Sequence, residues 1–138
     1  MTPEQVALVQ GSFAELDGGT ADLAARFYDR LFEADPSVRS MFSDDAADQR
    51  FIFMSELAVI VRSISRFDAF VVRTRHLGAQ HSHYGVTFLH YEIAGRALLS
   101  ALGETLGAAF TDDMREAWRL GFDLVAETMM QGAAEVPP

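Results

Sequence analysis

Apolar side chains recur along this sequence with the period of an α-helix. The clearest case is Phe53, Leu57, Ile60 and Ile64, which are spaced at i, i+4, i+7 and i+11 and predict one apolar helix face. A strand would alternate apolar and polar residues with a period of two, and no segment of the chain does so. Glycine and proline fall between the periodic segments, where helices end. The sequence therefore predicts an all-α fold.

The helix boundaries follow from capping residues, proline and glycine. Seven segments are expected: Thr2 to Leu16, Thr20 to Ala34 before the break at Asp35-Pro36, a short turn from Pro36 to Phe42, about Ala46 to Ile64 behind a Ser43-Asp44-Asp45 cap, about Phe67 to the stop at Gly85, about Leu89 to Leu106, and Thr111 to about Gln131. Thr2 with Gln5 predicts a capping box, and Pro3 suits the first helical position. No repeat or linker divides the chain, so we expect one domain over residues 1–132 and a frayed tail at 133–138.

Composition excludes several classes of function. The 138 residues contain no cysteine, which excludes disulfides, iron–sulfur clusters and a thiol nucleophile. Eleven basic residues against 20 acidic ones give a net charge of −9, and the basic residues are scattered, so no nucleic-acid partner is expected. There is neither a signal-peptide pattern nor an apolar run of about 18 residues, so we expect a cytoplasmic protein without a membrane partner.

The four histidines do not form a metal cage by their spacing. A helical zinc site needs two histidines at i, i+4, and no pair among His76, His81, His83 and His90 has that spacing. His81 differs because it lies on the apolar stripe of its own helix, with Leu77 and Tyr84. Two interpretations are open: a core histidine bonded to a backbone carbonyl, or an imidazole that ligates a porphyrin iron while its other nitrogen donates to a carbonyl.

Three other residues allow similar alternatives. Tyr28 is compatible with a tyrosine whose hydroxyl reaches the surface, Gln49 with an exposed first helical turn, and Phe42 with a core plug. Taken singly, these positions do not indicate a binding site.

Several segments in order resemble one known family. The proximal segment of bacterial haemoglobins and of the haemoglobin domain of flavohaemoglobins is His, two residues, an apolar or aromatic residue, Gly-Val, three residues and His-Tyr. This chain has His81-Ser-His-Tyr84-Gly85-Val86-Thr-Phe-Leu-His90-Tyr91. The segments Phe27–Phe32 and Asp35–Phe42 resemble the second helix of these proteins and the corner after it, and Ala117-Trp118 resembles their last helix. The similarity extends from about residue 4 to 131 and implies a globin fold of about seven helices around a haem pocket.

The resemblance implies roles for individual residues. His81 would be the proximal ligand of a haem b iron, and Phe42 the ring that wedges the porphyrin. Phe53 would wall the distal side, where Tyr28 and Gln49 would hydrogen-bond the gas. The proximal side would be lined by three further residues: Leu77, Val86 and Tyr91.

The implied function is reversible binding of oxygen, or of nitric oxide or carbon monoxide, at a five-coordinate iron. Two alternatives stay open: a nitric oxide dioxygenase that works with a separate reductase, since the chain stops at Pro138, and a gas or redox sensor or interaction domain. One departure matters, because relatives place a glutamate near the proximal histidine late in the last helix, and the count lands on Ala133 here. A carboxylate at that point would push electron density towards iron, so its absence disfavours reactions that need this push.

Overall fold

The computed structural model describes residues 1–16, 18–42 and 45–136, and within these ranges it contains helices and no strand. The elements are α1 (Pro3–Ala14), α2 (Thr20–Ala34), the 3₁₀ helix η1 (Pro36–Met41), α3 (Ala46–Ser63), α4 (Phe67–Ser82), α5 (Phe88–Leu106), the 3₁₀ helix η2 (Gly107–Ala109) and α6 (Asp112–Ala134). The prediction of an all-α chain is confirmed, and the helix boundaries lie within about three residues of those expected.

Local chemistry explains several of these boundaries. At α1 the capping box is present, because the backbone N–H of Thr2 donates to the Gln5 side chain and that of Gln5 to the Thr2 hydroxyl. Asp35 has an extended backbone, with φ at −148°, as expected before a proline, and α2 ends one residue earlier. Gly85 turns the chain after α4 with φ at +76°, a conformation that favours glycine.

The later helices differ slightly from the prediction. Helix α5 begins one residue early because Thr87 and His90 form a capping box, in which Thr87 N donates to His90 Nδ1 at 2.9 Å. Helix α6 begins behind the predicted cap Thr111 and continues through Ala133 and Ala134, inside the segment expected to fray. Asp45 caps α3, whereas the other residues predicted for that cap, Ser43 and Asp44, lie outside the described residues, as do Asp17 and residues 137–138.

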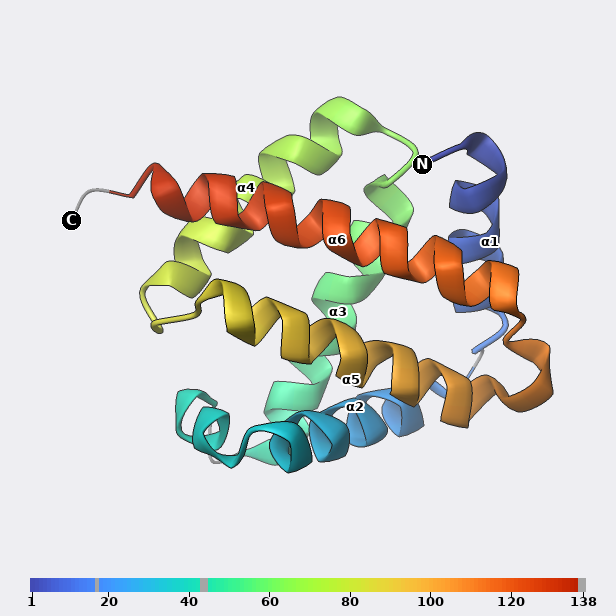
Figure 1. Cartoon of the computed structure of the whole chain (residues 1–138), viewed down its shortest axis with the longest axis horizontal. Helices are drawn as coiled ribbons and strands as arrows, with labels where there is room; N and C mark the ends of the chain where they lie inside the picture. The colour runs from blue at the N-terminus through green and yellow to red at the C-terminus, as the bar shows by residue number, and fades with distance from the viewer. Residues whose placement is uncertain (17, 43–44, 137–138) are drawn as a thin grey trace.

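Two helix pairs form the frame of the molecule. Helix α6 crosses α4, and α2 runs beside α5, with α3 behind them (Figure 1). At the α4–α6 crossing a Cβ on Gly78 would collide with the Met129 carbonyl, and one on Gly132 with the Arg75 carbonyl. The two backbones therefore touch, and only glycine fits at these two positions.

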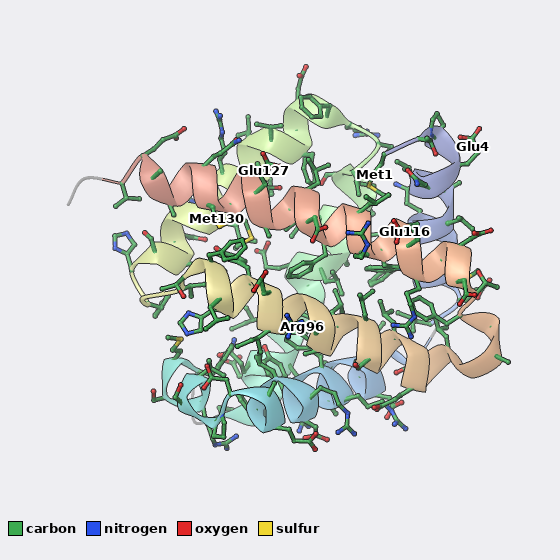
Figure 2. All side chains as sticks on the ribbon, in the orientation of Figure 1. Met1, Glu4, Arg96, Glu116, Glu127 and Met130 are labelled. Atoms are coloured by element: carbon green, nitrogen blue, oxygen red, sulfur yellow. The ribbon has the colours of Figure 1, made fainter. Side chains whose placement is uncertain are left out.

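Helix α6 has one exposed polar face and one buried face. Glu116 and Glu127 lie on its exposed face (Figure 2), while Trp118 is buried and its Nε1 donates to Ser12 of α1 at 2.8 Å. Within the described residues, no helix combines the length and apolar character needed to span a membrane.

Candidate functional site

The candidate proximal residue His81 lies in the last turn of α4 and is half-buried. Its Nδ1 is 2.8 Å from the backbone oxygen of Leu77, one turn earlier. A carbonyl oxygen only accepts, so Nδ1 carries the proton and Nε2 of the neutral ring keeps its lone pair. Among the described residues Nε2 has no hydrogen-bond partner. The imidazole is thus oriented by its own helix and presents one nitrogen that can ligate a metal.

The other predicted proximal residues are gathered in one apolar cluster. Tyr91 of α5 is buried, together with Ala126 and Met129 of α6, and Leu77 and Val86 pack against them. Burial raises the pKa of the Tyr91 phenol. The structure therefore brings together, from α4, the 83–87 turn and α5, the three residues expected to line the proximal side.

The predicted distal residues lie in a second, aromatic cluster. The Tyr28 ring, on α2, has its centroid 5.3 Å from that of Phe42 and 5.6 Å from that of Phe53, both edge to face. Sequence reasoning missed two members of this cluster as site residues: Phe27 stacks on Phe53 with centroids 4.3 Å apart, and Phe32 contacts both Tyr28 and Phe42. The i, i+4 spacing of apolar residues in the second helix includes Phe27 and Phe32, and it could have identified both.

Tyr28 is also tied to the beginning of α3. Its hydroxyl donates to the backbone oxygen of Gln49 over 3.4 Å, which is a long and weak hydrogen bond. Burial raises the pKa of Tyr28 to about 12, while a hydrogen bond with the Gln49 side chain and the charge of Arg50 oppose the shift. At neutral pH the phenol is therefore a protonated donor with an easily replaced acceptor. Gln49 is half-buried and contacts Tyr28 through its main-chain oxygen and its side chain.

The two clusters lie on different helices, and an ion pair that the sequence did not indicate joins α3 to α4. Arg73 of α4 donates from Nη2 to Oε1 of Glu56 on α3 at 2.7 Å. The other carboxylate oxygen, Oε2, is buried and has no partner among the described residues. Because the two residues lie on separate helices, no single-helix pattern could have revealed the pair.

The donor set indicates which kind of cofactor these residues could hold. No group of three or more histidine or acidic side chains that could hold a metal ion occurs in the described part of the chain, so the protein does not build a cage for a bare ion there. A porphyrin brings four nitrogens of its own and needs one protein ligand and apolar walls. That requirement fits the residues present: His81 as the ligand, with walls from the apolar cluster that contains Leu77 and Tyr91 and from the aromatic cluster.

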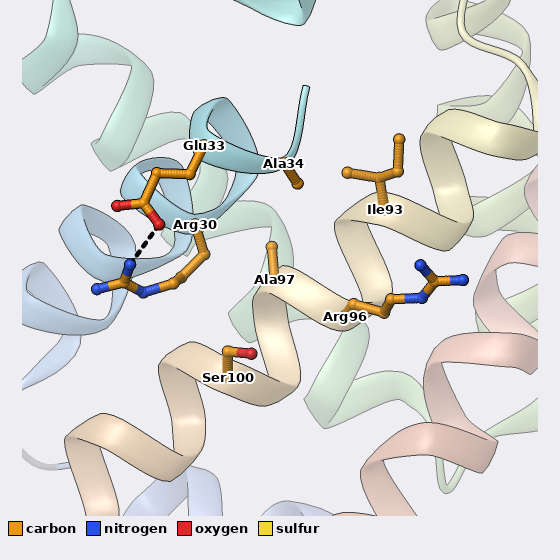
Figure 3. Close-up of a pocket in the computed structure, with 7 residues that line it drawn as sticks. All are labelled: Arg30, Glu33, Ala34, Ile93, Arg96, Ala97 and Ser100. Carbon is orange, nitrogen blue, oxygen red and sulfur yellow. Dashed lines mark hydrogen bonds and ion pairs between the residues drawn. The ribbon is translucent and has the colours of Figure 1, made fainter. Parts of the chain in front are cut away.

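A separate surface groove lies between α2 and α5. It has a volume of about 310 Å³ and is lined by Arg30, Glu33, Ala34, Ile93, Arg96, Ala97 and Ser100. Arg30 is paired with Glu33 and Glu104, and Figure 3 shows Arg96 pointing away from Arg30. The polar groups do not converge, and none of the predicted site residues lines this groove.

Comparisons with known proteins identify the family. The model of the Globin family matches residues 25–129. An anaerobic nitrite reductase of Gossypium hirsutum is 30% identical over 137 residues, which covers 88% of this chain and 84% of the relative. A flavohaemoprotein of Chromobacterium violaceum is 30% identical over 135 residues, covering 94% of this chain. The chain spans about a third of the length of this flavohaemoprotein and of its Bacillus subtilis counterpart.

Solved structures share the whole architecture. An engineered carbene transferase from Rhodothermus marinus, built on a proposed nitric oxide dioxygenase, superposes with a TM-score of 0.86 at 27% identity and covers 98% of this chain and 94% of its own. A hexacoordinated haem protein of an anhydrobiotic tardigrade gives 0.88 at 16% identity, with 98% and 96% covered, which shows the fold alone. The predicted globin fold is confirmed.

Proposed function

Since the chain belongs to the globin family, we propose that it binds haem b through His81 and reversibly binds oxygen or another diatomic gas. The observation that carries the proposal is the 2.8 Å hydrogen bond from His81 Nδ1 to the Leu77 oxygen. It fixes the ring on α4 and leaves Nε2 as the free donor atom. When bound, haem supplies an iron centre that coordinates diatomic gases and changes oxidation state.

The chain's own residues would exclude water and hold the gas. The Phe42 ring would wedge the porphyrin, with Phe53 on the distal side and Leu77, Val86 and Tyr91 on the proximal side. The Tyr28 phenol is protonated at neutral pH, so it can exchange its weak bond to Gln49 for a bond to the gas ligand. Gln49 would be the second distal hydrogen-bond donor, through its side-chain amide.

The surroundings of His81 favour reversible binding over redox catalysis. The hydrogen-bond acceptor of its Nδ1 is a neutral backbone carbonyl, and the residue in the position of the family's late glutamate is Ala133. A carbonyl makes the imidazole a weaker electron donor than a carboxylate would. We therefore assign gas binding as the first function.

A second candidate is nitric oxide dioxygenation, favoured by the similarity to flavohaemoproteins. Nitric oxide and oxygen take up one electron to form nitrate, so turnover needs an electron donor, and a separate reductase would fill that role. Steady NADH-dependent removal of nitric oxide with an added reductase would support this candidate, and the absence of turnover would leave gas binding alone. A third candidate is a gas or redox sensor or an interaction domain. Failure of the purified chain to take up haemin would favour the interaction domain.

The His81→Gly variant tests the proposal. We expect it to lose most of its haem and its Soret absorption, and added imidazole should restore both by occupying the space left by the side chain. His76→Gly is the matched control, since His76 is an exposed residue five positions earlier on the same helix. Pigment content and spectrum unchanged in His81→Gly, with far-UV circular dichroism showing a folded chain, would refute the assignment.

A further inference from the structure

The helices that carry the two sides of the proposed haem site are only loosely joined. Helices α3 and α4 diverge from the connection at residues 64–66 (Figure 1). Helix α4 packs chiefly on α6, and α3 shares fewer contacts with α4 than α4 does with α6. Direct contacts between α3 and α4 are therefore few.

One polar contact joins α3 directly to α4. Between the described residues of α3 and those of α4, the Arg73–Glu56 bond of 2.7 Å is the one side-chain hydrogen bond or ion pair. Glu56 lies one helical turn after Phe53, and Arg73 lies one turn before Leu77. The pair therefore lies between the connection and the proposed site, where a small change of helix angle is amplified at His81 and Gln49.

The pair is poorly suited to a purely stabilising role. Its side chains are 33% and 44% exposed, and an ion pair so open to water stabilises a fold little. Glu56 Oε2 is meanwhile buried without a partner among the described residues, which is unfavourable. Little net stabilisation is therefore expected from the pair, and its placement between α3 and α4 is the feature that indicates a positioning role.

The helices that form the two walls, α3 on the distal side and α4 on the proximal side, are also anchored to different helices. Helix α4 touches α6 backbone to backbone at Gly78 and Gly132. Helix α3 is joined instead to α2, through Phe53 and Phe27 and through Gln49 and Tyr28. We propose that the Glu56–Arg73 pair is a clamp that holds the distal wall at a fixed spacing from the proximal wall and so slows the escape of haem. The proposal rests on the proposed function, because it presupposes that haem lies between these walls.

The clamp is tested by measuring the rate at which the ferric protein loses haem to an excess of an apoglobin acceptor. We expect Glu56→Gln and Arg73→Met each to speed haem loss roughly two- to fivefold, the effect of one partly exposed ion pair. The double variant should be no faster than either single variant, and exchanging the charges, Glu56→Arg with Arg73→Glu, should slow the loss again. High salt should speed haem loss in the unmodified protein and not in the variants.

The matched control is Glu116→Gln. It breaks an exposed ion pair of similar length, Glu116–Arg119 at 2.6 Å, that lies within α6, and it should leave haem loss unchanged. Rates in Glu56→Gln equal to those of the unmodified protein, or no rescue by the exchanged pair, would refute the clamp.

Hydrogen exchange of the haem-free chain separates this proposal from the proposed function. Glu56→Gln should speed amide exchange in α3 more than in α4, because α4 stays anchored to α6. Equal exchange in the variant and the unmodified chain would refute the clamp, even if haem binding through His81 holds. If the chain binds no haem, the proposed function fails, while the exchange result still reports on the spacing of the two helices.

Discussion

The proximal and distal sides of the proposed site are built in different ways. On the proximal side α4 meets α6 through main chain, with Gly78 against the Met129 carbonyl and Gly132 against the Arg75 carbonyl. On the distal side the contacts are between aromatic rings: Phe27, Tyr28, Phe32, Phe42 and Phe53. A backbone contact cannot adjust by changing a rotamer, whereas rings can turn. The proximal side thus suits holding a ligating histidine in place, and the distal side suits accommodating a gas.

The largest expected effect comes from adding one methyl group on the proximal side. Gly78→Ala would push its Cβ into the Met129 carbonyl, and neither backbone can yield without separating the helices. Overpacking of this kind costs about 3 kcal/mol of unfolding free energy or more. Urea unfolding measures the loss, and His81, three residues further on, should hold haem less tightly.

Gly11→Ala is the control for that substitution. Gly11 lies inside α1, and a Cβ there meets nothing within 4 Å, so alanine should stabilise the chain by roughly 0.5–1 kcal/mol. A Gly78→Ala variant as stable as the unmodified chain would show that α4 and α6 are farther apart than the structure has them.

The distal side should be the more sensitive to alkaline pH. Burial raises the Tyr28 pKa to about 12 from 10.0, so the unfolded chain releases this proton at lower pH than the folded chain. The unfolded state therefore binds fewer protons above pH 10, and stability falls as pH rises towards 12. The full difference is roughly 2–3 kcal/mol, and about half of it should be lost by pH 11.

Urea unfolding of the unmodified chain and of Tyr28→Phe at pH 8 and pH 11 isolates this contribution. The variant should lose less stability between the two pH values. Burial raises the pKa of Tyr91 as well, so Tyr91→Phe gives the matching measurement on the proximal side. Equal losses in the unmodified chain and in Tyr28→Phe would mean that the Tyr28 hydroxyl reaches water.

The features predicted from the sequence are mostly local. Short-range sequence patterns predicted the caps at Thr2 and Thr111, the break at Asp35-Pro36 and the turn at Gly85, because each depends on residues a few positions apart. The Thr87–His90 cap was missed because the usual capping box has Glu or Gln at that position. The grouping of Tyr28 with Phe42 and Phe53 followed from the family resemblance.

Contacts between distant segments left no such signal. Gly78 and Gly132 each look like an unfavourable helix residue until the α4–α6 crossing is seen. Glu56 and Arg73 each look like one more charged residue on a solvated face, and only the fold brings them together. The sequence thus predicted residues for the two sides of the proposed site, and the structure added the contacts between distant segments.

The most local of the expected effects concerns a single hydrogen bond on the distal side. If the Tyr28 hydroxyl donates to bound oxygen, Tyr28→Phe should speed oxygen release roughly ten- to a hundredfold, because a hydrogen bond to a partly charged acceptor contributes about 1.5–3 kcal/mol. The ring contacts of residue 28 with Phe42 and Phe53 would remain, so the change isolates the hydroxyl. Tyr84→Phe, at an exposed tyrosine, should leave the rate unchanged in stopped-flow measurements. Unchanged release in Tyr28→Phe as well would remove Tyr28 from contact with the gas, and the aromatic cluster would then act on oxygen by excluding water alone.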